Sequence, residues 1–229
     1  LRTQGHDVYP VTLTGLGERS HLASREVDLD TYVADVVNLV EFEDLQDVVL
    51  VGHSYAGLVV TAVADRIPER ISVLAYLDSG PVPDGTAYLD LQPTPARQLI
   101  ERLVEDAGDG WQIPMPSWKE LEGVMGASLE GLGQDERSRM RARAVAQPAA
   151  TWTQPVSLKN PARERLPKLL IACSFPLAQV RQMIADGHPW FAEMAGPQWS
   201  FMELRTGHWP MFSAPDRLAD VLHDLPATR

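Results

Sequence analysis

The 229-residue sequence has little cysteine, little basic charge and no long apolar run. Its single cysteine, Cys173, can form no disulfide within the chain, which favours a reducing, cytoplasmic setting. The 20 lysines and arginines are outnumbered by 31 acidic residues, and the net charge of -11 argues against nucleic acid or an anionic membrane surface as a partner. Because no apolar run approaches the roughly 20 residues needed to span a bilayer, we expect no transmembrane helix.

What the sequence does contain is typical of a folded globular domain. Hydrophobic residues make up 45% and charged residues 22% of the chain, which is enough apolar material for one large core. The chain opens with LRTQGHDVYP, which reads as the end of a helix turning into a strand and contains no signal peptide. We therefore expect the first elements of the fold to precede Leu1.

Predicted strands and helices alternate near both ends of the chain. Most of the strands are short apolar runs, as expected for a parallel sheet covered on both faces. Asp28 or Asp30 is expected to cap the first helix. We predict strands at 7–14, 47–51, 71–78, 168–173 and 199–204, and helices at 30–42, 56–66, 177–185 and 215–222. This order predicts an α/β fold with a doubly wound, mostly parallel sheet, whose ligands bind at the carboxyl ends of the strands.

The middle of the chain interrupts this alternation. Residues 81–160 hold many of the prolines and three of the six tryptophans. Helices are predicted there only at 95–106 and 134–145. We interpret this segment as a helical cap inserted into a core made of residues 1–80 and 161–229.

The stretch VVLVGHSYAGLVV, residues 48–60, places Ser54 between a buried strand and a helix. A serine at such a sharp turn adopts a strained backbone conformation that lifts its hydroxyl above the sheet, as in G-x-S-x-G nucleophile elbows. The turn needs small residues two places before and after the serine, and Gly52 and Ala56 meet that need. The Tyr55 N–H, at the start of the helix, is the expected oxyanion donor. The alternative is a Gly-Ser turn without chemistry.

A nucleophilic serine needs a base, and His208 is the best placed of the six histidines. It follows the strand predicted at 199–204, in a loop that Gly207 allows to bend. The alternative is an ordinary loop histidine. His53 adjoins the serine but starts on the strand, so we expect it to pack or to support the site from behind.

The acid that orients the base is indicated less directly. Its usual place is the loop after the strand at 168–173, and CSFPLAQ, residues 173–179, holds no carboxylate. Asp78 ends the buried strand at 71–78, where burial demands a hydrogen-bond donor such as His208. Asp78 is therefore the predicted acid and Asp84 the second candidate, with a role in the following turn as the alternative for each.

Three stretches together resemble the α/β-hydrolase family. VGHSYAG is similar to its nucleophile elbow, TGHWPMFSAPDRLADVL to its histidine loop and last helix, and GHDVYPVTLTGLGERSH to its fourth strand and following loop. The matches run along nearly the whole chain. More narrowly, the sequence resembles the small bacterial esterases grouped with plant methylesterases and hydroxynitrile lyases.

The sequence departs from this family in three places. Ala56 replaces the second glycine of the elbow. The acid Asp78 follows the sixth strand, as in some relatives, instead of the seventh. The family's third strand, whose loop supplies a second oxyanion donor, normally precedes the point at which this chain starts, so we expect about 20 to 30 further residues before Leu1. An intact mass equal to that of the present chain would contradict this expectation.

The resemblance implies a serine hydrolase of carboxylic esters or lactones that needs no metal or organic cofactor. Trp111, Trp118, Trp152 and Trp209 are predicted to line the substrate pocket, with packing of the cap onto the sheet as the alternative. A lyase on the same scaffold is one rival, but Trp209 stands where hydroxynitrile lyases of this group carry lysine. A non-catalytic ligand-binding protein is the other. The sequence leaves open both the substrate and the oligomeric state, a homodimer included.

Overall fold

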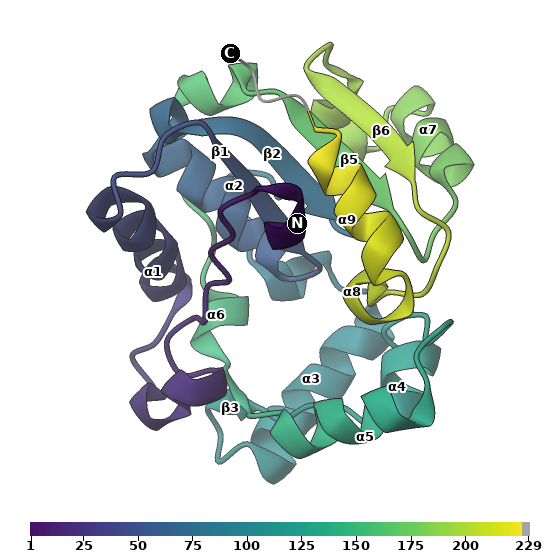
Figure 1. Cartoon of the computed structure of the whole chain (residues 1–229). Helices are drawn as coiled ribbons and strands as arrows, with labels where there is room; N and C mark the ends of the chain where they lie inside the picture. Colours follow the sequence, from purple (N-terminus) through teal and green to yellow (C-terminus); the bar gives the residue numbers. More distant parts are fainter. Residues whose placement is uncertain (226–229) are drawn as a thin grey trace.

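The computed structural model describes residues 1–225, without the side chains of residues 189 and 190. Four parallel strands form its central sheet in the order β1-β2-β5-β6 (Figure 1). They are β1 (Val48–His53), β2 (Ile71–Leu77), β5 (Lys168–Ala172) and β6 (Trp199–Glu203). Every residue of the two central strands, β2 and β5, is buried. The predicted α/β fold with a mostly parallel sheet is confirmed.

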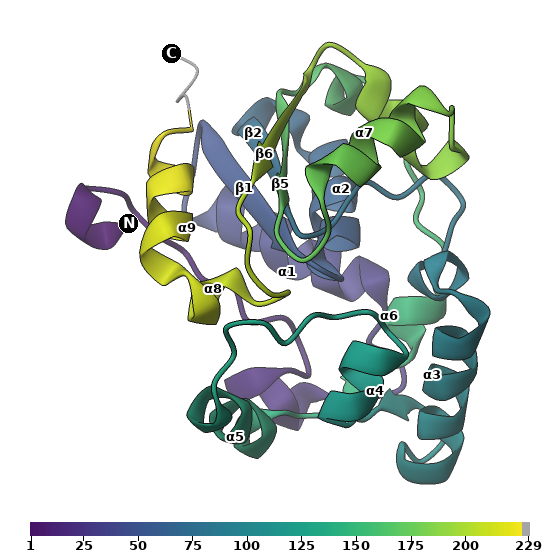
Figure 2. The ribbon, with the colours of Figure 1, turned by 90° about the vertical axis from the view of Figure 1, so that its right-hand side faces the viewer.

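Helices cover both faces of this sheet (Figure 2). On one face lie α1 (Leu29–Phe42), α2 (Ala56–Arg66) and α7 (Leu177–Ala185), and on the other lie α8 (Pro210–Ser213) and α9 (Pro215–His223). Tyr76 of β2 packs on the face covered by α1, α2 and α7, and its neighbour Leu77 packs on the face covered by α8 and α9. Both faces of the strand are therefore buried, which explains why it is apolar without alternation. Within the described residues, no helix combines the length and the apolar character that crossing a bilayer requires.

Most of residues 81–160 lie together on the side of the sheet where the strands end (Figure 1). They form α3 (Thr94–Ala107), α4 (Trp118–Gly123), α5 (Gln134–Arg143), α6 (Ala150–Thr153), the 3-10 helix η4 (Tyr88–Leu91) and an antiparallel pair, β3 (Gln112–Ile113) and β4 (Gln147–Pro148). The helices predicted at 95–106 and 134–145 correspond to α3 and α5. The β3–β4 pair was not predicted because strands of two residues carry no readable period. The division into core and cap stays a prediction.

Five further 3-10 helices occur outside this segment in the described part of the chain. They are η1 (Arg2–Gln4), η2 (Gly17–Leu22), η3 (Pro68–Arg70), η5 (Pro161–Arg165) and η6 (Pro189–Ala195). Of these, η6 matters most for the site, because Phe191 and Met194 contribute to the wall of the cavity described below.

Asp28, and not Asp30, caps α1. Its Oδ1 accepts a hydrogen bond from the Thr31 N–H at 2.9 Å, and the Thr31 hydroxyl completes a capping box. Asp30 instead forms an ion pair with Arg66 of α2 and accepts a hydrogen bond from Gln154. The first aspartate starts the helix, and the second joins it to its neighbours.

The prediction of a strand at 7–14 is wrong. No strand lies beside this segment among the described residues, and a backbone without a neighbour cannot enter a hydrogen-bonded ladder. Tyr9 and Val11 are 45% and 38% exposed. The segment runs over the surface to Thr14, whose N–H and hydroxyl donate to Asp35 of α1 at 2.6 and 2.9 Å. Alternating polarity alone was therefore an insufficient sign of a strand.

Candidate active site

Ser54 occupies the turn between β1 and α2 with a left-handed backbone φ of 52°. Strand and helix nearly touch here, since a Cβ added to Gly52 would lie 2.6 Å from the carbonyl oxygen of Ala56. A Cβ added to Gly57 would overlap the hydroxyl of Ser79, which follows β2. The glycine that this elbow requires after the serine is thus Gly57, and the loop after β2 imposes it.

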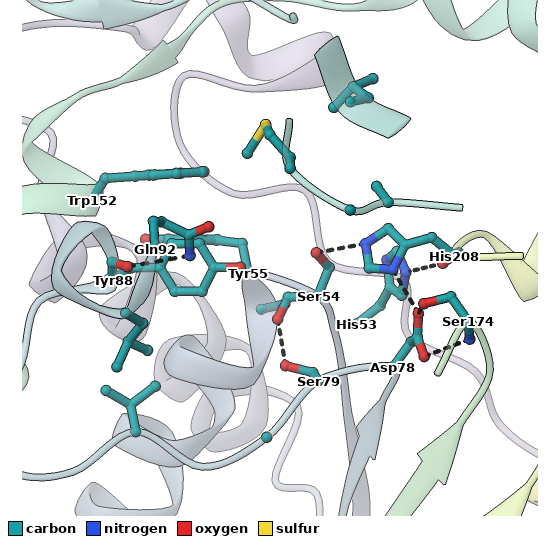
Figure 3. Close-up of a pocket in the computed structure, with 18 of the residues that line it drawn as sticks. His53, Ser54, Tyr55, Asp78, Ser79, Tyr88, Gln92, Trp152, Ser174 and His208 are labelled. Carbon is teal, nitrogen blue, oxygen red and sulfur yellow. Dashed lines mark hydrogen bonds and ion pairs between the residues drawn. The ribbon is translucent and has the colours of Figure 1, made fainter. Parts of the chain in front are cut away.

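The imidazole of His208 lies between Ser54 and Asp78 (Figure 3). Its Nε2 is 2.9 Å from Ser54 Oγ, and its Nδ1 is 2.7 Å from Asp78 Oδ2. When Nδ1 carries the proton, the ring donates to the carboxylate and can accept the serine proton at Nε2. The three residues follow β1, β2 and β6, so they meet at the carboxyl edge of the sheet. This order of contacts is that of a Ser-His-Asp triad.

The carboxylate of Asp78 is buried and surrounded by donors. Its Oδ1 accepts from the N–H groups of Cys173 and Ser174 at 2.8 and 2.9 Å, and its Oδ2 accepts from the Ser174 hydroxyl at 2.5 Å as well as from His208. Burial acts to raise the pKa of Asp78, but the hydrogen bonds from His208, Ser174 and Cys173 outweigh it and hold that pKa below its usual value. Asp78 is therefore ionised at neutral pH.

The loop after β5 supports the acid instead of supplying it. Residues 173–179 contain no carboxylate, but they contain Ser174, whose hydroxyl was the available sign of this role and was not among the predicted site residues. The second candidate acid, Asp84, accepts from the Leu158 N–H at 2.7 Å and lies 3.7 Å from the Lys159 ammonium. Of the two candidates, Asp78 is the one in contact with His208.

The backbone of His208 is held on both sides. Its N–H donates to the Ser128 carbonyl at 2.8 Å, and its own carbonyl accepts from His53 Nε2 at 2.6 Å. The N–H of Gly207 donates to the Glu130 carbonyl at 3.2 Å, and a Cβ at this glycine would overlap the Glu130 backbone. The glycine at 207 is required by this close approach of the 128–130 segment, and not by the bend that the sequence suggested.

Tyr55 begins α2 immediately after the serine. Within residues 1–225 its N–H has no protein acceptor, so it is available to an oxyanion. Its hydroxyl donates to the Thr151 carbonyl at 2.8 Å, and its ring stacks on Trp152 with centroids 5.9 Å apart. Burial raises the pKa of the Tyr55 phenol, which stays neutral. The role of Tyr55 as oxyanion donor stays a prediction.

Ser54 lines a cavity of about 1060 Å³. Its apolar wall includes Ile113, Met115, Leu121 and Met125 from the 81–160 segment and Phe175, Met183, Phe191 and Met194 from the region of α7 and η6. Among its described lining residues there is no lysine, arginine or glutamate, and the one aspartate is Asp78. In the part of the chain that the structure describes, no three His, Cys, Asp or Glu side chains are grouped as a metal site requires. The cavity suits an uncharged, largely apolar molecule.

Two of the four tryptophans predicted to bind substrate line this cavity. Trp209 lies beside His208, with ring centroids 5.0 Å apart. Trp152 packs edge-on against Tyr88, with centroids 4.7 Å apart. Tyr88, which was not among the predicted site residues, also lines the cavity. Burial raises its pKa, and the side chain of Ser54 acts in the opposite direction.

Trp111 and Trp118 are not among the described residues that line the cavity. The guanidinium group of Arg25 lies 5.7 Å from the ring centroid of Trp111, and that of Arg141 lies 5.5 Å from the ring of Trp118. These cation–π contacts fit the packing alternative, while Trp118 also packs edge-on against Trp209 of the cavity wall, with centroids 6.1 Å apart. Substrate binding by Trp111 and Trp118 stays a prediction.

Comparison with known proteins agrees with this geometry. A family model described as "Alpha/beta hydrolase family" matches residues 1–221. The sequence is 33% identical to a carbendazim hydrolyzing esterase of Nocardioides sp. (strain SG-4G), over 97% of this chain and 89% of that protein. It is 28% identical to a pyrethroid hydrolase of Sphingobium wenxiniae, over 98% of this chain and 79% of that protein.

Solved structures share the fold. An extracellular alpha/beta-hydrolase from a Paenibacillus species matches with a TM-score of 0.77 and 22% identity, over 96% of this chain and 88% of that one. A methylesterase from Arabidopsis matches with a TM-score of 0.67 and 21% identity, over 96% and 87%. The resemblance drawn from three stretches of sequence is confirmed, and the chain belongs to the alpha/beta hydrolase family.

Proposed function

We propose that this protein is a serine hydrolase that cleaves a carboxylic ester or lactone through an acyl-enzyme intermediate. The observation that carries the proposal is the chain of contacts from Ser54 through His208 to Asp78, at 2.9 and 2.7 Å. The similarity to proteins named as an esterase and a hydrolase supports hydrolysis of an ester-type bond.

In the first half of the reaction, Ser54 Oγ attacks the substrate carbonyl while His208 Nε2 takes the serine proton. Asp78 orients the imidazole and stabilises its positive charge. The Tyr55 N–H donates to the oxyanion of the tetrahedral intermediate. His208 then gives its proton to the leaving alkoxide, and the acyl group remains on Ser54.

In the second half, a water molecule takes the place of the departed alcohol. His208 removes a proton from this water, and the resulting hydroxide attacks the acyl carbon. Collapse of the second tetrahedral intermediate releases the carboxylic acid and returns the proton to Ser54. Each step uses side chains and backbone of this chain, so the scheme requires neither a metal nor an organic cofactor.

The substrate is a small, uncharged molecule with apolar groups around the scissile carbonyl. The support is the wall of the cavity, where an anionic substrate would meet no cation among the described lining residues. A buried carboxylate without such a partner is costly. We therefore expect neutral p-nitrophenyl alkanoates to exceed p-nitrophenyl hemisuccinate in kcat/KM by about tenfold or more.

Replacement of the nucleophile tests the mechanism. Ser54→Ala should abolish both p-nitrophenyl ester cleavage and labelling by a fluorophosphonate probe. Ser200→Ala, at an exposed position on β6, is the matched control and should behave as wild type. Turnover retained in Ser54→Ala would refute the assignment, and a wild-type protein that the probe does not label would favour ligand binding without catalysis.

A further inference from the structure

We infer that His53 is a positioning residue, which fixes the backbone of His208 and thereby aligns the imidazole with Ser54 and Asp78. The inference rests on the proposed function, since it concerns the same site. It assigns a mechanistic task to the residue that directly precedes the nucleophile.

The ring of His53 reaches from the end of β1 to the loop that carries the base (Figure 3). Its Nε2 lies 2.6 Å from the carbonyl oxygen of His208, and the two ring centroids are 4.8 Å apart. Because a carbonyl oxygen only accepts, Nε2 of His53 must carry the proton and donate it. His53 thus contacts the backbone of His208, and the adjacent Ser54 contacts its side chain.

This hydrogen bond has no substitute. Among the described residues, no other donor reaches the carbonyl oxygen of His208. On the opposite side, the N–H of His208 is bonded to the Ser128 carbonyl at 2.8 Å, so the peptide is held between the sheet and the 128–130 segment. Without His53 one of these two supports is lost, and the loop is free to turn its carbonyl toward water. A displacement of about 1 Å at such a site can cost about 100-fold in rate.

His53 gives this support without adding charge. Burial, and then the neighbouring His208, lower the pKa of His53 to about 4, so its ring is neutral at pH 7. A lysine or arginine donor in the same place would oppose the positive charge that His208 acquires when it takes the serine proton. A neutral N–H donor holds the carbonyl and leaves the base free to become charged.

Three substitutions at His53 separate the contribution of its N–H donor from the contribution of its ring. His53→Gln keeps an N–H donor near the position of Nε2 and should retain kcat and KM close to wild type. His53→Ala has no donor, and the amide of His53→Asn is too short, so both should lower kcat about 10- to 100-fold with little change in KM. His21→Ala, on the exposed helix η2, is the control and should leave both parameters unchanged.

A spectroscopic readout reports the alignment itself. The Nδ1 proton of His208, held by Asp78, should give a downfield proton NMR resonance. We expect it to persist in His53→Gln and to broaden or move upfield in His53→Ala. Thermal unfolding confirms that each variant is folded at the assay temperature.

Two results would overturn the inference: wild-type kcat in His53→Ala, or equal losses in the Gln and Ala variants. If His53→Ala does not fold, the Gln and Asn variants decide the question by the same comparison. Failure of the proposed function is distinguishable, because turnover would then persist in Ser54→Ala whatever the NMR response to changes at His53.

Discussion

Oδ2 of Asp78 lies 2.7 Å from Nδ1 of His208, although the two residues follow strands that are not neighbours. Strand β5 lies between β2 and β6 in the sheet, so the loop of His208 reaches past the end of β5 to meet Asp78. The loop after β5 then bonds Asp78 through Cys173 and Ser174. The acid is therefore held by one loop while it orients another.

Asp78→Asn should lower kcat by about 10⁴-fold while leaving the protein folded. The amide no longer fixes the imidazole tautomer or stabilises its positive charge. Ester hydrolysis kinetics measure the loss. Asp84→Asn makes the same chemical change at a carboxylate whose partners are Leu158 and Lys159, and it should retain wild-type activity. A comparable loss at position 84 would contradict the choice of acid.

Ser174→Ala removes a donor 2.5 Å from Asp78 and should raise the pKa of that carboxyl. The pKa of Asp78 is lowered in the folded protein, so its stabilising effect is present above the unfolded value near 3.8 and is lost as the pH falls through the folded value. We expect the variant to unfold about 1–3 kcal/mol more easily in urea at pH 7. This difference should shrink as the pH falls below 3.8 toward the lowered folded value, whereas Ser200→Ala should show no difference at any of these pH values.

The turn between β1 and α2 predicts unequal effects of substitution at two adjacent positions. Ala56→Gly should leave activity nearly unchanged and cost up to about 1 kcal/mol of stability, since glycine is the poorer helix former. Gly57→Ala places a methyl group against the Ser79 hydroxyl and should cost about 1–3 kcal/mol together with much of the activity. Urea unfolding and ester kinetics on both variants provide the comparison. An unaffected Gly57→Ala protein would show that the contact with Ser79 is unimportant.

His53 should make the fold sensitive to mild acid. Its pKa is about 4 in the folded protein against 6.5 for the free side chain, so the unfolded chain binds the extra proton first. The stability that neutral His53 provides is complete above pH 6.5 and declines as the pH falls toward 4, by up to about 3 kcal/mol. His53→Gln should lack this part of the decline. Unfolding free energies at pH 7, 5.5 and 4.5 measure the effect, and parallel curves for the two proteins would count against it.

How well the sequence predicted each element depended on how fully that element is buried. The central strands β2 and β5 are apolar at nearly every position, and the sequence located both to within about one residue. Polar and apolar residues alternate along 7–14 as they do in a half-buried strand, yet no strand of the described structure pairs with this segment. The alternation of polar and apolar residues indicates which side chains can share a face. It does not indicate whether a partner strand is present.

The three main residues of the site could be predicted from their positions along the chain. Ser54, His208 and Asp78 each follow a predicted strand, so the parallel order alone brings them to one edge of the sheet. Ser174 could not be selected because a serine in a loop has many ordinary roles. The bond from His53 to the His208 carbonyl depends on tertiary geometry that no local pattern encodes.

The carbonyls of Ser128 and Glu130 accept the N–H groups of His208 and Gly207, and the neighbouring residues Gly126 and Ala127 line the cavity. The same short stretch thus forms part of the cavity wall and also supports the backbone of His208. If residues 126–130 moved away from the cavity, the hydrogen bonds that hold the backbone of Gly207 and His208 would be lost. Any change in the conformation of this stretch would therefore alter the shape of the cavity and the position of the His208 backbone together.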